Sequence, residues 1–128
     1  MPAESDATKG PDLGEGEPFL RIAPAEARRL IEGGAHVIDV RRPAEFAEAH
    51  IAGSLNIDAD DLFRRRAQLC LDDDIVVACR IGVVSAYGAE ILAMLGATRV
   101  YNLEGGIEEW GRLGYPLEGS RGIQPADG

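Results

Sequence analysis

The residues best suited to chemistry lie in the stretch CRIGVVS, from Cys79 to Ser85, which directly follows the apolar run DIVVA. A cysteine attacks as its thiolate, and positive potential near the sulfur favours that form. A helix that begins after the cysteine would present unpaired N–H groups, and a tight turn can direct further N–H groups inward. Gly82 permits a positive φ in such a turn, and Arg80 adds a cation to face an incoming anion. The stretch predicts a nucleophilic cysteine, although a cysteine that only packs at a strand end fits the same local pattern.

Strand and helix patterns alternate along the part of the chain that must position this loop. Apolar runs predict strands at 19–23, 36–40, 54–57, 74–79 and 99–103. Periodic patterns predict helices at 24–34, 42–50, 59–69, 85–96 and 105–114, with Ser85 as the cap of the fourth. Such alternation predicts an α/β fold, a parallel sheet with helices on both faces. Binding sites in such sheets lie beyond the carboxyl ends of the strands, where Cys79 is placed.

Length and composition limit the class of protein. The 128 residues suffice for one domain, predicted at 19–118, between mobile tails at 1–18 and 119–128. A net charge of −9 disfavours nucleic acids and anionic membranes as partners. Two cysteines are too few for a disulfide scaffold or a four-thiolate metal site. No apolar run reaches the ~18 residues that span a bilayer and no secretory signal is evident, so we expect a cytoplasmic protein.

Five motifs stand in an order that closely resembles the rhodanese-like sulfurtransferase family. They are DVR at 39–41, Glu45, HIAGSLNI at 50–57, the Cys79 loop, and YNLEGGIEEW at 101–110. Each motif is weak evidence alone, but together, at these spacings, they are highly specific. The resemblance covers about residues 19–118 and implies a single rhodanese-like domain with a mostly parallel five-stranded sheet.

The resemblance also implies a reaction and the residues that carry it. Cys79 matches the nucleophile, which takes the outer sulfur of a donor such as thiosulfate and holds it as a persulfide. A thiol, cyanide or a protein acceptor then removes that sulfur, and no metal or organic cofactor is expected. Arg41 matches an arginine near the floor of the site, expected to tie the loop to the strand end by hydrogen bonds. The cradle around the persulfide is matched by the backbone of Arg80, Ile81, Gly82, Val83, Val84 and Ser85.

One position departs from the family pattern. Many single-domain members carry an arginine where this chain has Val84, which leaves Arg80 as the one charged residue of the loop. The pocket should therefore be more apolar. Our hypothesis is that a less charged donor, or a persulfide on a thiol or protein partner, is preferred over thiosulfate.

Three alternative functions remain open at the level of sequence. A phosphatase or arsenate reductase needs a larger loop and a clamping arginine, which Val84 cannot supply. A non-catalytic or sulfur-carrier binding module is the second alternative: inactive members of such folds usually lose the nucleophile, and Cys79 is present, yet its presence does not prove turnover. A redox sensor needs a resolving cysteine nearby, and Cys70 is expected at the opposite end of a strand.

The remaining polar and sulfur-bearing residues have simpler interpretations. Cys70 is expected to be a packing residue, too far from the nucleophile for a disulfide. His50 should be a structural histidine bonded to nearby backbone, and His36 should lie on the surface at the other end of the sheet. Asp39 falls within an apolar strand and needs a partner, for which Arg41 is suited.

Overall fold

The computed structural model describes residues 16–120, so most of both predicted tails lies outside the described residues. The strands are β1 Leu20–Ile22, β2 His36–Asp39, β3 Leu55–Asn56, β4 Ile75–Ala78 and β5 Val100–Leu103. The helices are α2 Pro24–Glu32, α3 Pro43–Glu48, α4 Val84–Met94 and α5 Gly106–Arg112, with short 3-10 turns η2 Ala59–Asp61 and η3 Arg66–Gln68. Among the helices of this described part, none is long and apolar enough to cross a membrane.

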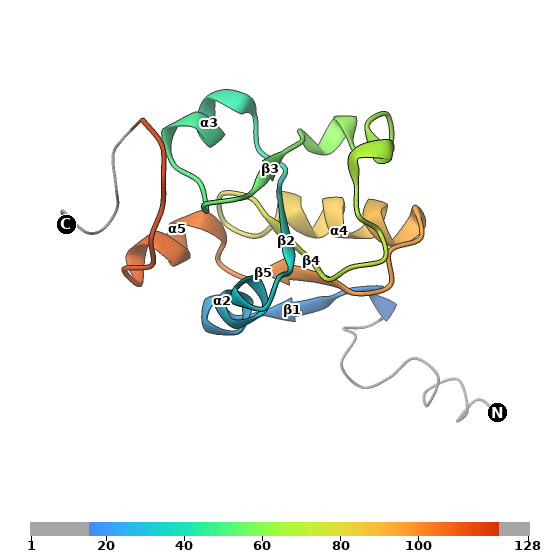
Figure 1. The fold of residues 1–128 in the computed structure, drawn as a ribbon, viewed down its shortest axis with the longest axis horizontal. Coiled ribbons are helices and arrows are strands. Elements are labelled where there is room, and N and C mark those ends of the chain that lie inside the picture. The colour runs from blue at the N-terminus through green and yellow to red at the C-terminus, as the bar shows by residue number, and fades with distance from the viewer. Residues whose placement is uncertain (1–15, 121–128) are drawn as a thin grey trace.

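The five strands form one sheet in the order β1-β5-β4-β2-β3 (Figure 1). Every neighbouring pair is parallel, as the alternation of strands and helices predicts. β4 is the central strand, and all four of its residues are buried. The loop that starts at Cys79 therefore leaves the middle of the sheet at its carboxyl edge, where the sequence predicts a site.

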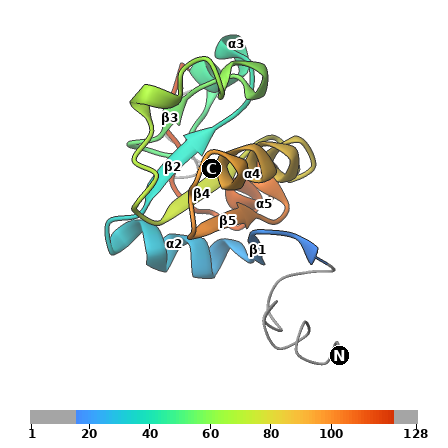
Figure 2. The same ribbon diagram turned by 90° about the vertical axis from the view of Figure 1, so that its right-hand side faces the viewer.

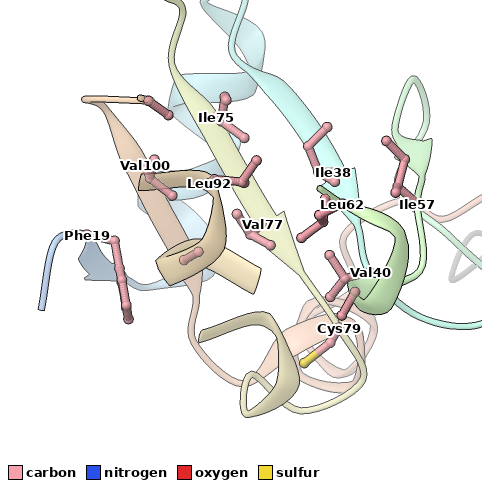
Figure 3. Close-up of a cluster of buried hydrophobic side chains, with 13 residues drawn as sticks. Phe19, Ile38, Val40, Ile57, Leu62, Ile75, Val77, Cys79, Leu92 and Val100 are labelled. Atoms are coloured by element: carbon pink, nitrogen blue, oxygen red, sulfur yellow. The ribbon is translucent and has the colours of Figure 1, made fainter. Parts of the chain in front are cut away.

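Helices cover both faces of this sheet, as predicted (Figure 2). Successive residues of β4 point to opposite faces. Ile75 and Val77 pack with Leu92 of α4 in one cluster, which Figure 3 shows together with Cys79 at the end of the strand. The alternate residues of β4 pack on the other face with α2 and α5, in a cluster that includes Trp110. The nucleophile candidate is thus anchored at the edge of a packed core.

The segment 59–69 does not form the continuous helix that its residue pattern predicts. It contains only the two 3-10 turns η2 and η3. Leu62 is fully buried against α4, but Phe63 is 62% exposed, and Arg64 and Arg66 face outward. Helices of this length are held mainly by an apolar face, and one buried leucine supplies too little of it.

Candidate active site

Cys79 directly follows β4, and its side chain lies at the floor of an open pocket. The residue is only 3% exposed and packs in the cluster of Val40 and Val77. It nevertheless lines a cavity of about 540 Å³, together with Arg41 and Tyr87. The sulfur is therefore surrounded by apolar atoms on one side and open to a ligand on the other.

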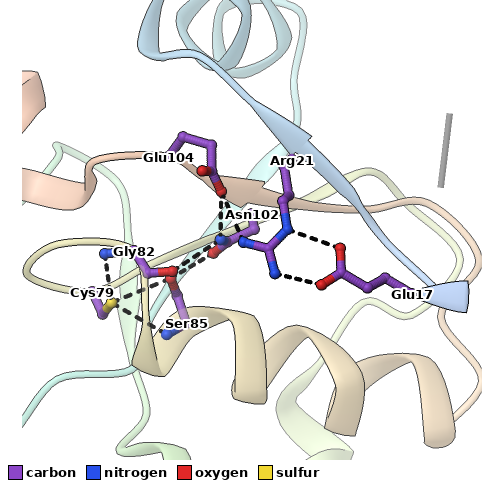
Figure 4. Close-up of polar contacts among 7 residues, drawn as sticks. All are labelled: Glu17, Arg21, Cys79, Gly82, Ser85, Asn102 and Glu104. Atoms are coloured by element: carbon purple, nitrogen blue, oxygen red, sulfur yellow. Dashed lines mark hydrogen bonds and ion pairs between the residues drawn. The ribbon is translucent and has the colours of Figure 1, made fainter. Parts of the chain in front are cut away.

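Two backbone amides of the loop point at the sulfur (Figure 4). The N–H of Gly82 lies 3.1 Å from Cys79 Sγ and that of Ser85 lies 3.2 Å from it. Among residues 16–120, these are the backbone amides that hydrogen-bond to Sγ. An arrangement of converging amides stabilises negative charge on the sulfur.

The start of α5 fixes the orientation of the loop. The N–H of Ile107 donates to the carbonyl of Cys79 over 2.8 Å, and that of Glu108 donates to the carbonyl of Arg80 over 3.0 Å. In a trans peptide the carbonyl and the following N–H point in opposite directions. The N–H groups of Arg80 and Ile81 therefore point away from α5. The carbonyls of Cys79 and Arg80, which would repel an anion, accept hydrogen bonds from the first turn of α5 instead of facing the sulfur.

Gly82 is required at the turn for two reasons. Its φ is +95°, a region that residues with a side chain rarely adopt. A Cβ at this position would lie 3.1 Å from both the carbonyl oxygen of Leu103 and the amide nitrogen of Gly105. The turn thus packs directly against the backbone that links β5 to α5.

Ser85 does not cap the helix, which corrects the sequence-based expectation. α4 begins one residue earlier, its N-cap is Val83, and no side chain caps it. The hydroxyl of the fully buried Ser85 instead lies 3.2 Å from Cys79 Sγ and donates to the side-chain carbonyl of Asn102. Its backbone and its side chain both contact the sulfur, so Ser85 belongs to the site and not to the helix cap.

Asn102 of β5 connects the loop to the rest of the molecule. It lies within the motif YNLEGGIEEW, but its residue type and spacing did not indicate a contact with the loop. Its side-chain amide donates to the carbonyl of Gly82 and to the carboxylate of Glu104, each over 3.0 Å. Arg21 of β1 bridges Glu104 and Glu17 (Figure 4). The hydrogen bond from Arg21 lowers the pKa of the Glu17 carboxyl and raises the pKa of the guanidinium. This chain of contacts extends from the sulfur to the surface.

Arg80 does not face the pocket as a free cation. Its guanidinium forms an ion pair with Glu108 at 2.6 Å, and the two side chains are 58% and 59% exposed. The positive charge expected to meet an incoming anion is therefore already paired.

Arg41 lines the pocket beside the loop, but its guanidinium is bonded to other parts of the chain. Its guanidinium forms two hydrogen bonds to Asp39, at 2.9 and 2.8 Å, and a third to the carbonyl of Ala49 at 2.6 Å. The predicted pairing of Arg41 with the buried Asp39 is confirmed. The predicted hydrogen bonds from Arg41 to the Cys79 loop are not found among the described residues.

The mouth of the pocket is apolar and electrically balanced. Ile81, Val83, Val84 and Tyr87 line it and are between 42% and 66% exposed. The charged lining consists of three arginines and three acids, Arg41, Arg42, Arg80, Glu45, Asp58 and Asp60. Positive potential is therefore not concentrated at the entrance, and the main attraction for an anion comes from the loop amides.

His50 and Cys70 lie outside the pocket, and the structure tests the role expected for each. The Nδ1 atom of His50 lies 2.6 Å from the carbonyl of Phe46, and the two rings stack, which confirms a structural histidine. The expectation that Cys70 is a packing residue is wrong, because Cys70 is exposed. It lies near His36 and Asp73 at the amino end of the sheet, away from the loop.

The chain belongs to the rhodanese-like domain family, which matches residues 23–113. A thiosulfate sulfurtransferase GlpE of Pseudomonas aeruginosa strain LESB58 is 43% identical over 104 residues, 81% of this chain and 94% of that protein. The protein of the same name from Ectopseudomonas mendocina is 39% identical over 106 residues, 83% of this chain and 96% of that protein.

Solved structures of other organisms share the fold. A rhodanese-related protein from Thermoplasma volcanium superposes with a TM-score of 0.69 at 36% identity, over 77% of this chain and 96% of that one. The CoADR-RHD protein of Bacillus anthracis gives a TM-score of 0.68 at 33% identity, over 73% of this chain and 17% of that one. This fold therefore occurs both as a separate protein and as part of a larger chain.

Proposed function

We propose that this protein, a rhodanese-type sulfurtransferase, transfers a sulfane sulfur through a persulfide on Cys79. The observation that carries the proposal is the sulfur of Cys79, which faces the amides of Gly82 and Ser85 at the floor of an open pocket. The family and the names of the relatives support the class of reaction.

The reaction divides into two displacements at sulfur. In the first, the Cys79 thiolate attacks the outer sulfur of the donor, and the donor's S–S bond breaks. With thiosulfate the products are the Cys79 persulfide anion and sulfite, so charge and atoms balance. In the second, an acceptor thiolate or cyanide attacks the terminal sulfur, leaves with it, and restores the Cys79 thiolate. No electrons are exchanged with an outside oxidant or reductant.

The loop amides suit the persulfide as well as the thiolate. A persulfide places its negative charge on the outer sulfur, which extends from Sγ toward the pocket. The N–H groups of Arg80 and Ile81 follow Cys79 directly in the chain and point away from α5. They are the next candidate donors to this outer sulfur. Rigid amides that already point at developing charge stabilise it without rearrangement.

Intact mass spectrometry after exposure to a sulfur donor tests this proposal. We expect one gain of about 32 Da, the mass of one sulfur atom added to a thiol. The gain should persist in Cys70→Ser, disappear in Cys79→Ser, and be discharged by cyanide or a thiol. A gain located on Cys70, or none with either thiosulfate or a small-molecule persulfide, would refute the mechanism.

We further propose that the preferred donor carries less charge than thiosulfate, such as a persulfide on a thiol or protein. Three observations support this preference. Arg80 is paired with Glu108, the positive and negative charges lining the pocket are equal in number, and the rim of the pocket is apolar and exposed. The relatives named thiosulfate sulfurtransferase support thiosulfate as a usable donor. The preference fails if thiosulfate gives the highest kcat/KM among several donors.

Val84→Arg should improve the use of thiosulfate. Val84 is 50% exposed at the rim, so an arginine there can reach the pocket without burial. A cation about 7 Å from a dianion gains roughly 1 kcal/mol in water. Steady-state assays should show kcat/KM for thiosulfate rising roughly threefold to tenfold, with the gain shrinking as salt is added. Met94→Arg adds the same charge at the far end of α4 and should leave kcat/KM unchanged. An equal gain in both variants would contradict a local effect.

A sulfur carrier without turnover is the second candidate, favoured by the exposed apolar rim that a protein partner could cover. The same mass measurement separates the two functions. A carrier would hold the added sulfur in the presence of cyanide and small thiols and release it only to a protein. A phosphatase is disfavoured, because the loop's one arginine is paired with Glu108 and Val84 offers no clamp.

A further inference from the structure

Three metal-ligating side chains meet at the end of the sheet opposite the Cys79 loop. They are His36, Cys70 and Asp73, and one potential ligand atom from each lies within 4.8 Å of the other two. His36 Nε2 and Asp73 Oδ2 are 2.8 Å apart. The proposed sulfur transfer uses none of these residues. No sequence pattern connects them, because His36 and Cys70 lie far apart along the chain.

The backbone holds the three residues in place. The N–H of Asp73 donates to the carbonyl of Cys70 over 3.1 Å, which closes a turn with two residues between the ligands. Two-residue spacing across a turn is common in structural zinc sites, where it directs both side chains to one ion. The N–H of His36 donates to the carbonyl of Asp74 over 2.9 Å, so the start of β2 is fixed beside the turn.

A neighbouring arginine, Arg99, stabilises the turn and pairs with a second carboxylate that could otherwise compete for a metal ion. Arg99 donates to the side chain of Asp74 at 2.8 Å and to the carbonyl of Asp72 at 2.7 Å. Asp74 is therefore already paired. Asp73, whose described partner is His36, is the carboxylate of this turn that is placed to bind a metal ion.

We propose that His36, Cys70 and Asp73 form a binding site for one zinc-like divalent cation. A thiolate, an imidazole and a carboxylate are the ligands that zinc accepts in tetrahedral geometry. Calcium and magnesium prefer sites built from oxygen alone, so the thiol and the imidazole argue against them. On binding, the Cys70 thiol loses its proton to water as the sulfur–metal bond forms, and His36 binds in its neutral form.

The distances require only small movements of side chains. Zinc bonds of about 2.0–2.3 Å at tetrahedral angles place neighbouring ligand atoms roughly 3.3–3.6 Å apart. His36 Nε2 and Asp73 Oδ2 must separate by about half an ångström, and Cys70 Sγ must approach by at most about 1.2 Å. His36 and Asp73 are 40% and 58% exposed, so both side chains can move.

The fourth coordination position is open to water. Cys70 is exposed, and His36 and Cys70 also line a small cavity of about 60 Å³. A water molecule occupies roughly 30 Å³ in the liquid, so this cavity can hold a metal-bound water. A bound ion would link the start of β2 to the turn before β4. The site would therefore stabilise the amino end of the sheet independently of the proposed function.

Cobalt binding to the full chain carrying Cys79→Ser tests the site, because Cys70 is then the one thiol left. Titration with Co²⁺ should give one ion per chain and a thiolate-to-cobalt absorption band, and zinc should displace the cobalt. Cys70→Ser should remove the band. His36→Gln should weaken cobalt binding at least about tenfold, since it removes one of three ligands.

Asp73→Asn and Asp72→Asn form a matched pair, because both remove one exposed negative charge from the same turn. Asp73→Asn should weaken cobalt binding at least about tenfold, and Asp72→Asn by less than about twofold. Absence of the absorption band would overturn the proposal. Equal weakening by the two variants would also overturn it, since binding would then reflect only the general acidity of the turn.

Discussion

Gly106→Ala should reduce persulfide formation at least about 100-fold, the scale seen when donors at a charged site are lost. A Cβ at Gly106 would lie 2.4 Å from the carbonyl oxygen of Arg80 and 2.5 Å from that of Cys79. Both neighbours are backbone atoms of the catalytic loop, so neither can swing aside. The substitution must push α5 away from the loop. The hydrogen bonds from Ile107 and Glu108 to the two carbonyls would then break.

The same substitution should lower the free energy of unfolding by about 3 kcal/mol or more. Two lost hydrogen bonds cost about 1 kcal/mol each, and alanine at a positive φ adds about 1–2 kcal/mol. The φ of Gly106 is +63°. Chemical denaturation measures the stability, and timed mass spectrometry measures the rate of persulfide formation.

Gly53→Ala is the matched control, because Gly53 also has a positive φ, +82°, but its Cβ would meet nothing within 4 Å. It should cost only the backbone strain of about 1–2 kcal/mol and leave the rate of persulfide formation unchanged. If Gly106→Ala behaves like Gly53→Ala, the close contact between α5 and the loop does not position the nucleophile.

The order of strands and helices was readable from the sequence because short segments rich in apolar residues alternate with helical patterns and are separated from them by turns. β4 is the clearest case, since its four residues are all buried and all apolar. Parallel sheets covered on both faces produce such runs. The failure at 59–69 has a local cause: its pattern is helical, but Leu62 is its only large apolar residue with no exposure. A residue pattern does not reveal how much core is available to hold a helix.

The part of the site formed by residues close together in the chain could be predicted from the sequence. The part formed by residues that only the fold brings together could not. Cys79, Gly82 and Ser85 are close in sequence, so their spacing indicates a loop around a sulfur. The contacts that shape this loop come from Asn102 and Gly106, which the fold brings alongside it. The expectation that Ser85 caps its helix is wrong for the same reason. Its hydroxyl donates to Asn102 of β5 instead of capping its own helix.

Asn102→Leu should cause the second large loss, in stability and in sulfur transfer together. Asn102 is fully buried, and its side chain accepts from Ser85 and donates to the carbonyl of Gly82. Leucine has the same branched skeleton and number of heavy atoms but no polar atoms, so the buried Ser85 hydroxyl loses its acceptor and the buried Gly82 carbonyl loses its donor. Each unpaired group costs about 1–3 kcal/mol, which predicts a loss of roughly 2–5 kcal/mol in the free energy of unfolding. Persulfide formation should slow roughly tenfold to 100-fold, because Gly82 no longer holds its amide on Sγ.

Asn56→Leu provides the control for simple destabilisation. Asn56 likewise donates from its side chain to two carbonyls, those of Asp39 and Arg41, at another strand end. We expect a comparable loss of stability with a smaller change in the rate of persulfide formation.

Asn102→Asp retains the oxygen that accepts from Ser85 but loses the donor to Gly82, so it should slow the reaction nearly as much as leucine. If both Asn102 variants slow it only as much as Asn56→Leu does, Asn102 supports the fold and does not position the sulfur.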